Sequence, residues 1–111
     1  MIREARAVWS VVLAVAALLA SGCASGGAGA EEQLELGYRA ARRGYWQEAL
    51  LRFERARQAA PQDMRILNDL AVALEATGRF EEALVTYQTA LDIAPADRKL
   101  RKNYERFKQF Y

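Results

Sequence analysis

Histidine is absent from this chain of 111 residues, and cysteine occurs only once, at Cys23. Without histidine, neither a Ser-His-Asp nor a Cys-His catalytic group can form, and a zinc site of the usual ligand types cannot be built. A single cysteine also excludes a disulfide within the chain. We therefore predict that the protein is not an enzyme, has no catalytic residues and holds no metal or dissociable cofactor.

Long apolar runs are also scarce, although apolar residues make up 52% of the chain. The one long run extends from Ala7 to Ala20 and contains a single polar residue, Ser10. A helix needs about 20 apolar residues to cross the hydrocarbon core of a bilayer, so this run is too short. A short basic start followed by such a run is typical of a secretory signal. We predict that residues 1–22 are a signal peptide that is removed.

The only cysteine ends the sequence LASGC at residues 19–23. This sequence resembles the bacterial lipobox, although Ala20 stands where leucine is usual. The resemblance implies that Cys23 carries a covalent lipid, which would anchor the chain to a membrane of the cell envelope. Because Ala24 and not Asp follows, it also implies the outer membrane, facing the periplasm. The alternatives are an ordinary signal peptide cut after a small residue, or an uncleaved anchor.

Residues 24–30 consist of glycine, alanine and one serine. Such a composition is typical of a flexible linker. We therefore expect residues 23–30 to comprise the lipidated cysteine and a flexible tether, with the folded part beginning at residue 31.

The remainder of the chain repeats with a period of 34 residues, as the positions of Pro61 and Pro95 illustrate. Each block reads as a helical hairpin, because apolar residues recur at helical spacing on both sides of a glycine. The matching pairs are Leu36 and Leu70, Gly37 and Ala71, Gly44 and Gly78, Trp46 and Phe80, Ala49 and Ala83, Phe53 and Tyr87, and Ala56 and Ala90.

This pattern resembles the tetratricopeptide repeat. The resemblance implies an all-α fold, an antiparallel helix-turn-helix solenoid with one repeat at 31–63, a second at 64–97 and a C-terminal capping helix at 98–111. Asp97 is a suitable N-cap for that last helix. Its apolar stripe consists of Leu100, Tyr104, Phe107 and Tyr111. An unrelated stack of helical hairpins would share the same core.

In this family the first helix of each repeat lines a groove that binds peptides. By register, the residues that face this groove are predicted to be Leu34, Tyr38, Arg65, Asn68, Val72, Lys99, Lys102 and Arg106. Glu31, Ala41 and Glu75 occupy equivalent places. The family's Lys and Asn clamp for a C-terminal carboxylate is not met, because Leu34, Tyr38 and Val72 replace its polar residues.

Basic charge is concentrated at the end of the chain. Residues 98–111 hold six basic residues and one acidic residue, whereas residues 23–97 hold eight basic and twelve acidic residues. This basic helix suits an acidic protein segment, anionic lipid headgroups, or simply a solvated outer face. Nucleic acid is not an expected partner, because an exported, lipidated chain rarely meets it.

Among the aromatic residues, Trp46 and Phe80 are predicted to pack in the core. Tyr45, Leu51 and Val85 are expected to point outward. The leading hypothesis is therefore an adaptor or assembly factor that binds a protein partner in the cell envelope. The alternative is a self-associating structural envelope protein, because two repeats are few for such an array and open repeat ends can stack into a homo-oligomer.

Overall fold

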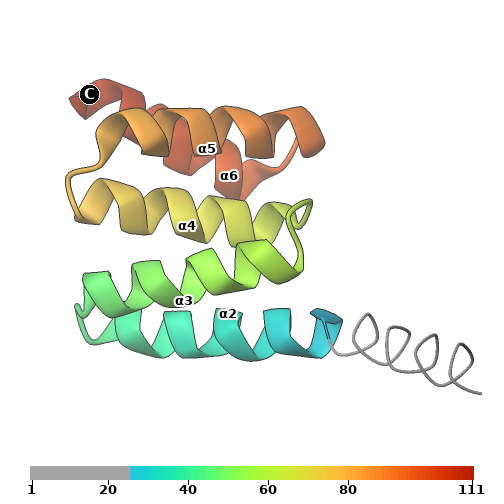
Figure 1. Ribbon diagram of the computed structural model, residues 1–111. Helices are drawn as coiled ribbons and strands as arrows, with labels where there is room; N and C mark the ends of the chain where they lie inside the picture. Colours follow the sequence, from blue (N-terminus) through green and yellow to red (C-terminus); the bar gives the residue numbers. More distant parts are fainter. Residues whose placement is uncertain (1–25) are drawn as a thin grey trace, which may run out of the picture.

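The computed structural model describes residues 26–111, and within this range the chain forms five helices and no strand (Figure 1). The helices are α2 (Gly26–Arg42), α3 (Trp46–Ala59), α4 (Met64–Ala76), α5 (Phe80–Ile93) and α6 (Arg98–Phe110). Helices α2 and α3 form one antiparallel hairpin, and α4 and α5 form a second hairpin stacked on the first. Helix α6 packs against α4 and α5. The predicted all-α solenoid is confirmed.

A glycine ends the first helix of each hairpin. Gly44 and Gly78 have φ angles of 77° and 79°, in the left-handed region that favours glycine. After Gly44 the chain closes the turn with a hydrogen bond of 2.9 Å from the Tyr45 amide to the Ala40 carbonyl. The Arg79 amide donates to the Leu74 carbonyl in the same way, also at 2.9 Å. The two turns are therefore the same structure, repeated.

The connection between the two hairpins and the connection from the second hairpin to α6 each contain a proline followed by an aspartate. The aspartate caps the next helix. The Asp63 carboxylate accepts a hydrogen bond from the Arg65 amide at 3.0 Å, and the Asp97 carboxylate accepts one from the Leu100 amide at 2.9 Å. Each bond satisfies an amide that the first turn of a helix leaves free. The prediction that Asp97 is an N-cap is confirmed.

Small residues let the helices of each hairpin approach closely. A Cβ atom added to Gly37 would lie 2.6 Å from Cδ1 of the Phe53 ring, so α2 and α3 depend on the glycine for their contact. Ala49, Ala71 and Ala83 are fully buried at equivalent crossings. The largest fully buried side chains of the core are Phe53, Ile66, Leu70, Leu74, Tyr87 and Leu100.

Helix α6 is held by the residues of its apolar stripe. Leu100 and Phe107 are buried, and Tyr104 is half-buried against the ring of Tyr87 at 5.8 Å. Tyr111 stacks on Phe107 with ring centroids 5.0 Å apart, but it remains 54% exposed because it lies just past the end of the helix. The predicted cap therefore covers the second hairpin.

The prediction of a flexible tether reaching residue 30 was wrong for residues 26–30, because α2 begins at Gly26. Ala30 is buried in the core, one turn before Leu34 on the same face of the helix. The extra turn therefore buries an apolar side chain, and alanine has the highest helix propensity of any residue. The remaining tether residues and Cys23 lie outside the described residues, as does the predicted signal peptide.

Candidate functional site

The face built by α2, α4 and α6 is hollowed between the helices. Four hollows adjoin one another on this face, because neighbouring hollows have lining residues in common. The residues that line at least two of them include Tyr38, Asp69, Val72, Lys99 and Arg106. We call this continuous surface the inner groove. Its central hollow has a volume of about 230 Å³ and is lined by Tyr38, Ala41, Trp46, Phe53, Asp69, Val72, Lys99, Asn103 and Arg106.

Aromatic and apolar side chains form the walls of the central hollow. Tyr38 is half-buried and meets the buried Phe53 ring edge-on, with ring centroids 6.0 Å apart and an interplanar angle of 78°. Trp46 enters from the first turn of α3 and is also half-buried against the core. An aliphatic or aromatic side chain of a ligand would find apolar partners here.

Asp69 is a buried carboxylate in the lining of this groove. Its side chain is only 8% exposed, and its Oδ2 atom has no hydrogen-bond partner among residues 26–111. Burial raises the pKa of the Asp69 carboxyl above its ordinary value, and the nearby Tyr38 hydroxyl, Lys99 and Arg65 oppose this shift only in part. The Asp69 carboxylate thus lies in the lining of the hollow between α2, α4 and α6, with its Oδ2 atom enclosed and unpaired among the described residues.

A chain of carboxamides joins Asp69 to α6. Asn103 donates from Nδ2 to the Asn68 Oδ1 atom at 3.0 Å, and Asn68 Nδ2 lies 3.5 Å from Asp69 Oδ1. Asn68 is 3% exposed, so its two polar atoms depend on these neighbours. The bonds fix the position of α6 relative to α4 and leave only Oδ2 of Asp69 open.

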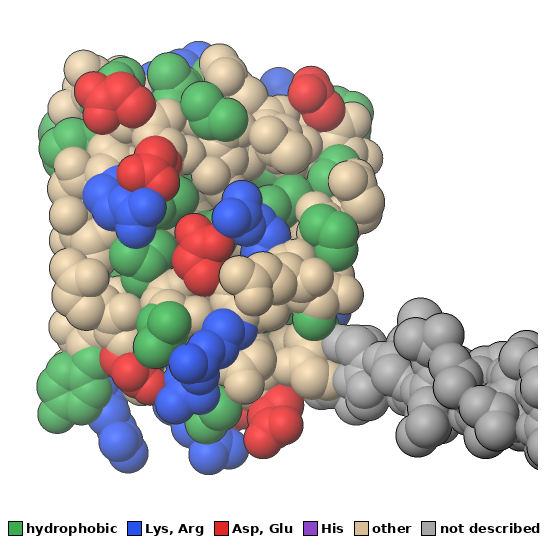
Figure 2. Space-filling view, in the orientation of Figure 1, with side chains coloured by type: hydrophobic (Ala, Val, Ile, Leu, Met, Phe, Trp, Pro, Cys, Tyr) green, Lys and Arg blue, Asp and Glu red, His purple; other side chains and the backbone are tan. Residues whose placement is uncertain are grey.

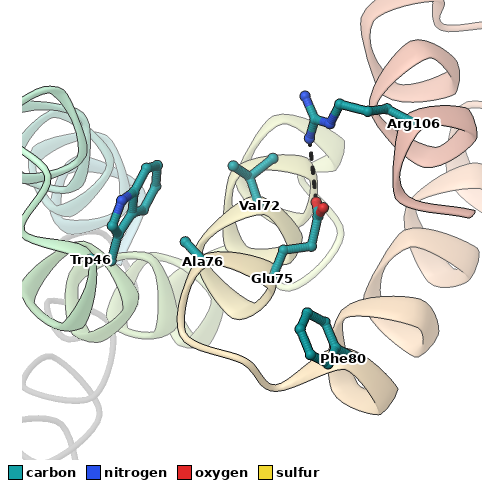
Figure 3. Close-up of a pocket in the computed structure, with 6 residues that line it drawn as sticks. All are labelled: Trp46, Val72, Glu75, Ala76, Phe80 and Arg106. Atoms are coloured by element: carbon teal, nitrogen blue, oxygen red, sulfur yellow. Dashed lines mark hydrogen bonds and ion pairs between the residues drawn. The ribbon is translucent and has the colours of Figure 1, made fainter. Parts of the chain in front are cut away.

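At the other end of the groove, Glu75 connects three helices. The hydroxyl of Tyr87, a buried residue of α5, donates a hydrogen bond to Glu75 Oε2. Arg106 of α6 reaches the same oxygen at 3.4 Å. Figure 3 shows this ion pair across α4 from Trp46, with Val72 between the two sides. Phe80 completes the lining of this end.

The cations around the inner groove are unequally paired. Arg65 forms ion pairs with Asp63 at 2.8 Å and Glu31 at 3.2 Å. Lys99, by contrast, has no ion-pair partner in the part of the chain that the structure describes, although it lines three of the hollows. Charged and apolar side chains are interspersed over the face of the stack that Figure 2 shows, so no extended field of one sign covers it.

Residues 34–98, more than half of the chain, match the tetratricopeptide repeat family. The chain belongs to this family. The TPR domain of OM64 from Arabidopsis, a solved structure, is 13% identical, with a TM-score of 0.43, over 78% of this chain and 99% of that domain. A comparison with curated proteins gives no match. TPR proteins generally mediate binding between proteins and are generally not catalysts, which indicates an interaction role for this chain.

Most of the groove residues predicted from the TPR register line the inner groove. The structure places Tyr38, Arg65, Asn68, Val72, Lys99 and Arg106 there, with Asn68 buried in its floor. Lys102 is exposed on α6 and does not line the hollows described above. Leu34 was wrongly assigned to the groove, because its side chain is 2% exposed and packs in the core. Peptide binding by these residues stays a prediction.

The register missed Asp69 and Asn103. Asp69 lies next to Asn68 in a run from Ile66 to Leu74 whose other residues are apolar. A charged residue in such a run is the signal that could have identified it. Trp46, predicted to be a core residue, also forms part of the groove wall. Phe80, its counterpart in the second repeat, was wrongly assigned to the core, because it is 44% exposed beside Tyr111.

Outside the groove, Tyr45, Leu51 and Val85 point outward as predicted, with Val85 61% exposed. Over residues 26–111, no group of His, Cys, Asp and Glu side chains is arranged to hold a metal ion. Within the same range, none of the helices combines the length and the apolar character needed to span a bilayer.

Proposed function

We propose that this chain is a membrane-anchored TPR lipoprotein that binds a segment of a protein partner in its inner groove. In this role it serves as an adaptor or assembly factor of the bacterial cell envelope and is not an enzyme. The inner groove carries the proposal, because it combines aromatic walls from Tyr38 and Trp46 with a few converging polar groups. That combination is typical of sites that bind ligands with defined orientation.

The envelope location is supported by the sequence alone. The run from Ala7 to Ala20 and the LASGC sequence at residues 19–23 favour export and lipidation of Cys23. The two or three acyl chains of a mature lipoprotein anchor it stably, since each buried methylene contributes about 0.8 kcal/mol. Ala24 favours the outer membrane and a position facing the periplasm.

Site-specific photocrosslinking in the native host tests the binding role. Benzoylphenylalanine is placed at Val72 in the inner groove, and a matched variant carries it at Val85 on the outer face. We expect Val72 to crosslink one defined protein, identified by mass spectrometry, while Val85 does not crosslink that protein. Equal crosslinking from both positions, or none from Val72, would contradict groove binding.

Self-association is a second candidate, which the exposed aromatic residues at the end of α6 favour. Phe110 is 87% exposed, and Tyr111 and Phe80 are 54% and 44% exposed. Light scattering of the detergent-solubilised full chain separates this candidate from the first. A dimer that Phe110→Ser converts to a monomer would support stacking through this end. A monomer at high protein concentration would rule it out.

A further inference from the structure

The Asp69 carboxylate is in an unfavourable environment, because it is largely removed from solvent. Its Oδ2 atom is buried without a hydrogen-bond partner among residues 26–111. A buried polar atom left in this state costs free energy. Because the unpaired oxygen belongs to a groove-lining residue, a ligand that supplies a donor would recover that cost.

Lys99, on the α6 side of the groove, is the second charge without a close partner. It stands in the first turn of α6, where the helix dipole disfavours a cation. Lys99 lines the same two hollows as Asp69. Lys99 also lowers the pKa of the Asp69 carboxyl, against the larger opposing effect of burial.

Two of the other cations beside these hollows have ion-pair partners within the fold. Arg65 is neutralised by Asp63 and Glu31, and Arg106 lies 3.4 Å from Glu75. Arg42 adds a second cation at the end of the groove where it and Lys99 line one hollow. The groove therefore offers a ligand an anionic acceptor in its floor and a cationic edge.

We propose that the partner segment presents a lysine or arginine next to an acidic residue, the cation bonding to Asp69 and the carboxylate to Lys99. This proposal rests on the proposed function and specifies the chemistry of its partner. An acidic side chain would be repelled at Asp69, whereas a lysine or arginine has donors only. The aliphatic stem of that side chain would lie against Tyr38 and Trp46, as stems of cationic side chains do on apolar surfaces.

Alanine-flanked hexapeptides with blocked ends test this chemistry. Their two central residues are Lys-Glu, Lys-Gln, Gln-Glu or Gln-Gln, and the Lys-Glu pair is also made in reverse order. The mature lipidated chain in detergent is used, because removal of residues 1–22 takes Trp9 away and leaves Trp46 in the groove wall to report binding by fluorescence. We expect one of the Lys-Glu orders to bind about tenfold more tightly than either singly charged peptide, and we expect added salt to weaken it.

Two variants test separately the contact of the ligand's cation with Asp69 and the contact of its carboxylate with Lys99. Asp69→Asn should abolish the preference for lysine over glutamine while keeping the preference for glutamate. Lys99→Gln should do the opposite. The matched controls are Asp92→Asn, on the exposed face of α5, and Lys102→Gln, on α6 outside the groove lining, and both should leave all affinities unchanged.

The proposal is overturned if Gln-Gln binds as tightly as Lys-Glu, if no peptide binds at millimolar concentration, or if Asp69→Asn keeps the lysine preference. Circular dichroism of each variant verifies that the helices are intact. Failure of the peptides together with a specific Val72 crosslink would leave groove binding standing and reject only this partner chemistry. Failure of both would reject the proposed function as well.

Discussion

Gly37 of α2 lies directly against the ring of Phe53 of α3, and a side chain at this position would overlap the ring. Phe53 is 2% exposed and is enclosed by the core, so it has little room to move away. The close approach of α2 and α3 thus depends on the absence of a side chain at residue 37.

We expect Gly37→Ala to destabilise the fold by about 1–3 kcal/mol, the usual cost of overpacking a core. The matched control is Gly29→Ala, because a Cβ atom at Gly29 meets nothing within 4 Å and alanine favours the helix. Urea denaturation followed by circular dichroism measures both. Equal stability of the two variants would show that the α2–α3 contact is looser than described.

Tyr87 should stabilise the junction of α4 and α5 through Glu75. A hydrogen bond to a charged group contributes about 1.5–3 kcal/mol, so Tyr87→Phe should lower the free energy of unfolding by an amount in that range. In a double-mutant cycle with Glu75→Gln, the two losses should not add, because both variants weaken one bond. Full additivity would exclude the bond as a source of stability.

The same tyrosine predicts sensitivity to alkali. Burial, and then the hydrogen bond to Glu75, raise the pKa of Tyr87 above its ordinary value of 10.0. Above pH 10 the unfolded chain loses this proton while the folded chain keeps it, so stability falls as the pH rises. Tyr87→Phe should therefore unfold with a weaker dependence on pH above 10. Thermal melts between pH 8 and 11 make the comparison, with exposed Tyr45→Phe as the control.

Asp69→Asn should raise the melting temperature at neutral pH. The amide carries no charge, so the cost of enclosing an incompletely bonded carboxylate, on the order of 1–3 kcal/mol, is relieved. Because burial raises the pKa of Asp69 in the folded state, the wild-type carboxyl gains a proton there before it does in the unfolded chain. The wild type should thus regain relative stability as the pH falls through that raised pKa towards 3.8.

Melting curves of the wild type and Asp69→Asn from neutral pH down to about 3.8 measure this difference in stability. Asp92→Asn, on the exposed face of α5, provides the comparison for a change of charge alone. A variant that is less stable than the wild type at neutral pH would mean that the carboxylate is satisfied within the fold.

Cys23→Ala should abolish labelling with palmitate and release the processed chain from the membrane fraction. The reason is that a lipid thioether needs the cysteine, and the described helices do not provide a bilayer-spanning segment. Radiolabelled palmitate incorporation and cell fractionation measure the two effects, with Ser25→Ala as the control. Membrane attachment that persists without Cys23 would reject lipidation as the anchor.

The hairpins could be predicted from the sequence because their determinants are local. Gly44 and Gly78 adopt positive φ at the turns, and small residues at the helix crossings recur with the period of 34. The groove could be predicted only in outline. Register places a residue on a face of its helix, but the packing of neighbouring helices decides whether that face is open.

Leu34 and Asp69 illustrate this limit from opposite sides. Leu34 has a groove register, but α2 extends back to Gly26, and Leu34 is buried with Ala30 in the core. Asp69 has no groove register, but α2 and α6 approach α4 and enclose it in the groove lining. Both outcomes depend on contacts between residues far apart in the sequence.

The hydrogen bond between Asn103 and Asn68 is one of a small number of contacts that join α6 to the rest of the inner groove. Helices α2 and α4 each pack along a hairpin partner, whereas α6 has none. It is held by Leu100, Tyr104 and Phe107, by the ion pair of Arg106 with Glu75 and by this hydrogen bond. Elements with fewer packed contacts open at lower free energy than the core. Amides of α6 should therefore exchange with solvent faster than those of α4. The side of the groove that carries Lys99 should then adapt to ligand side chains of different size more readily than the sides formed by α2 and α4.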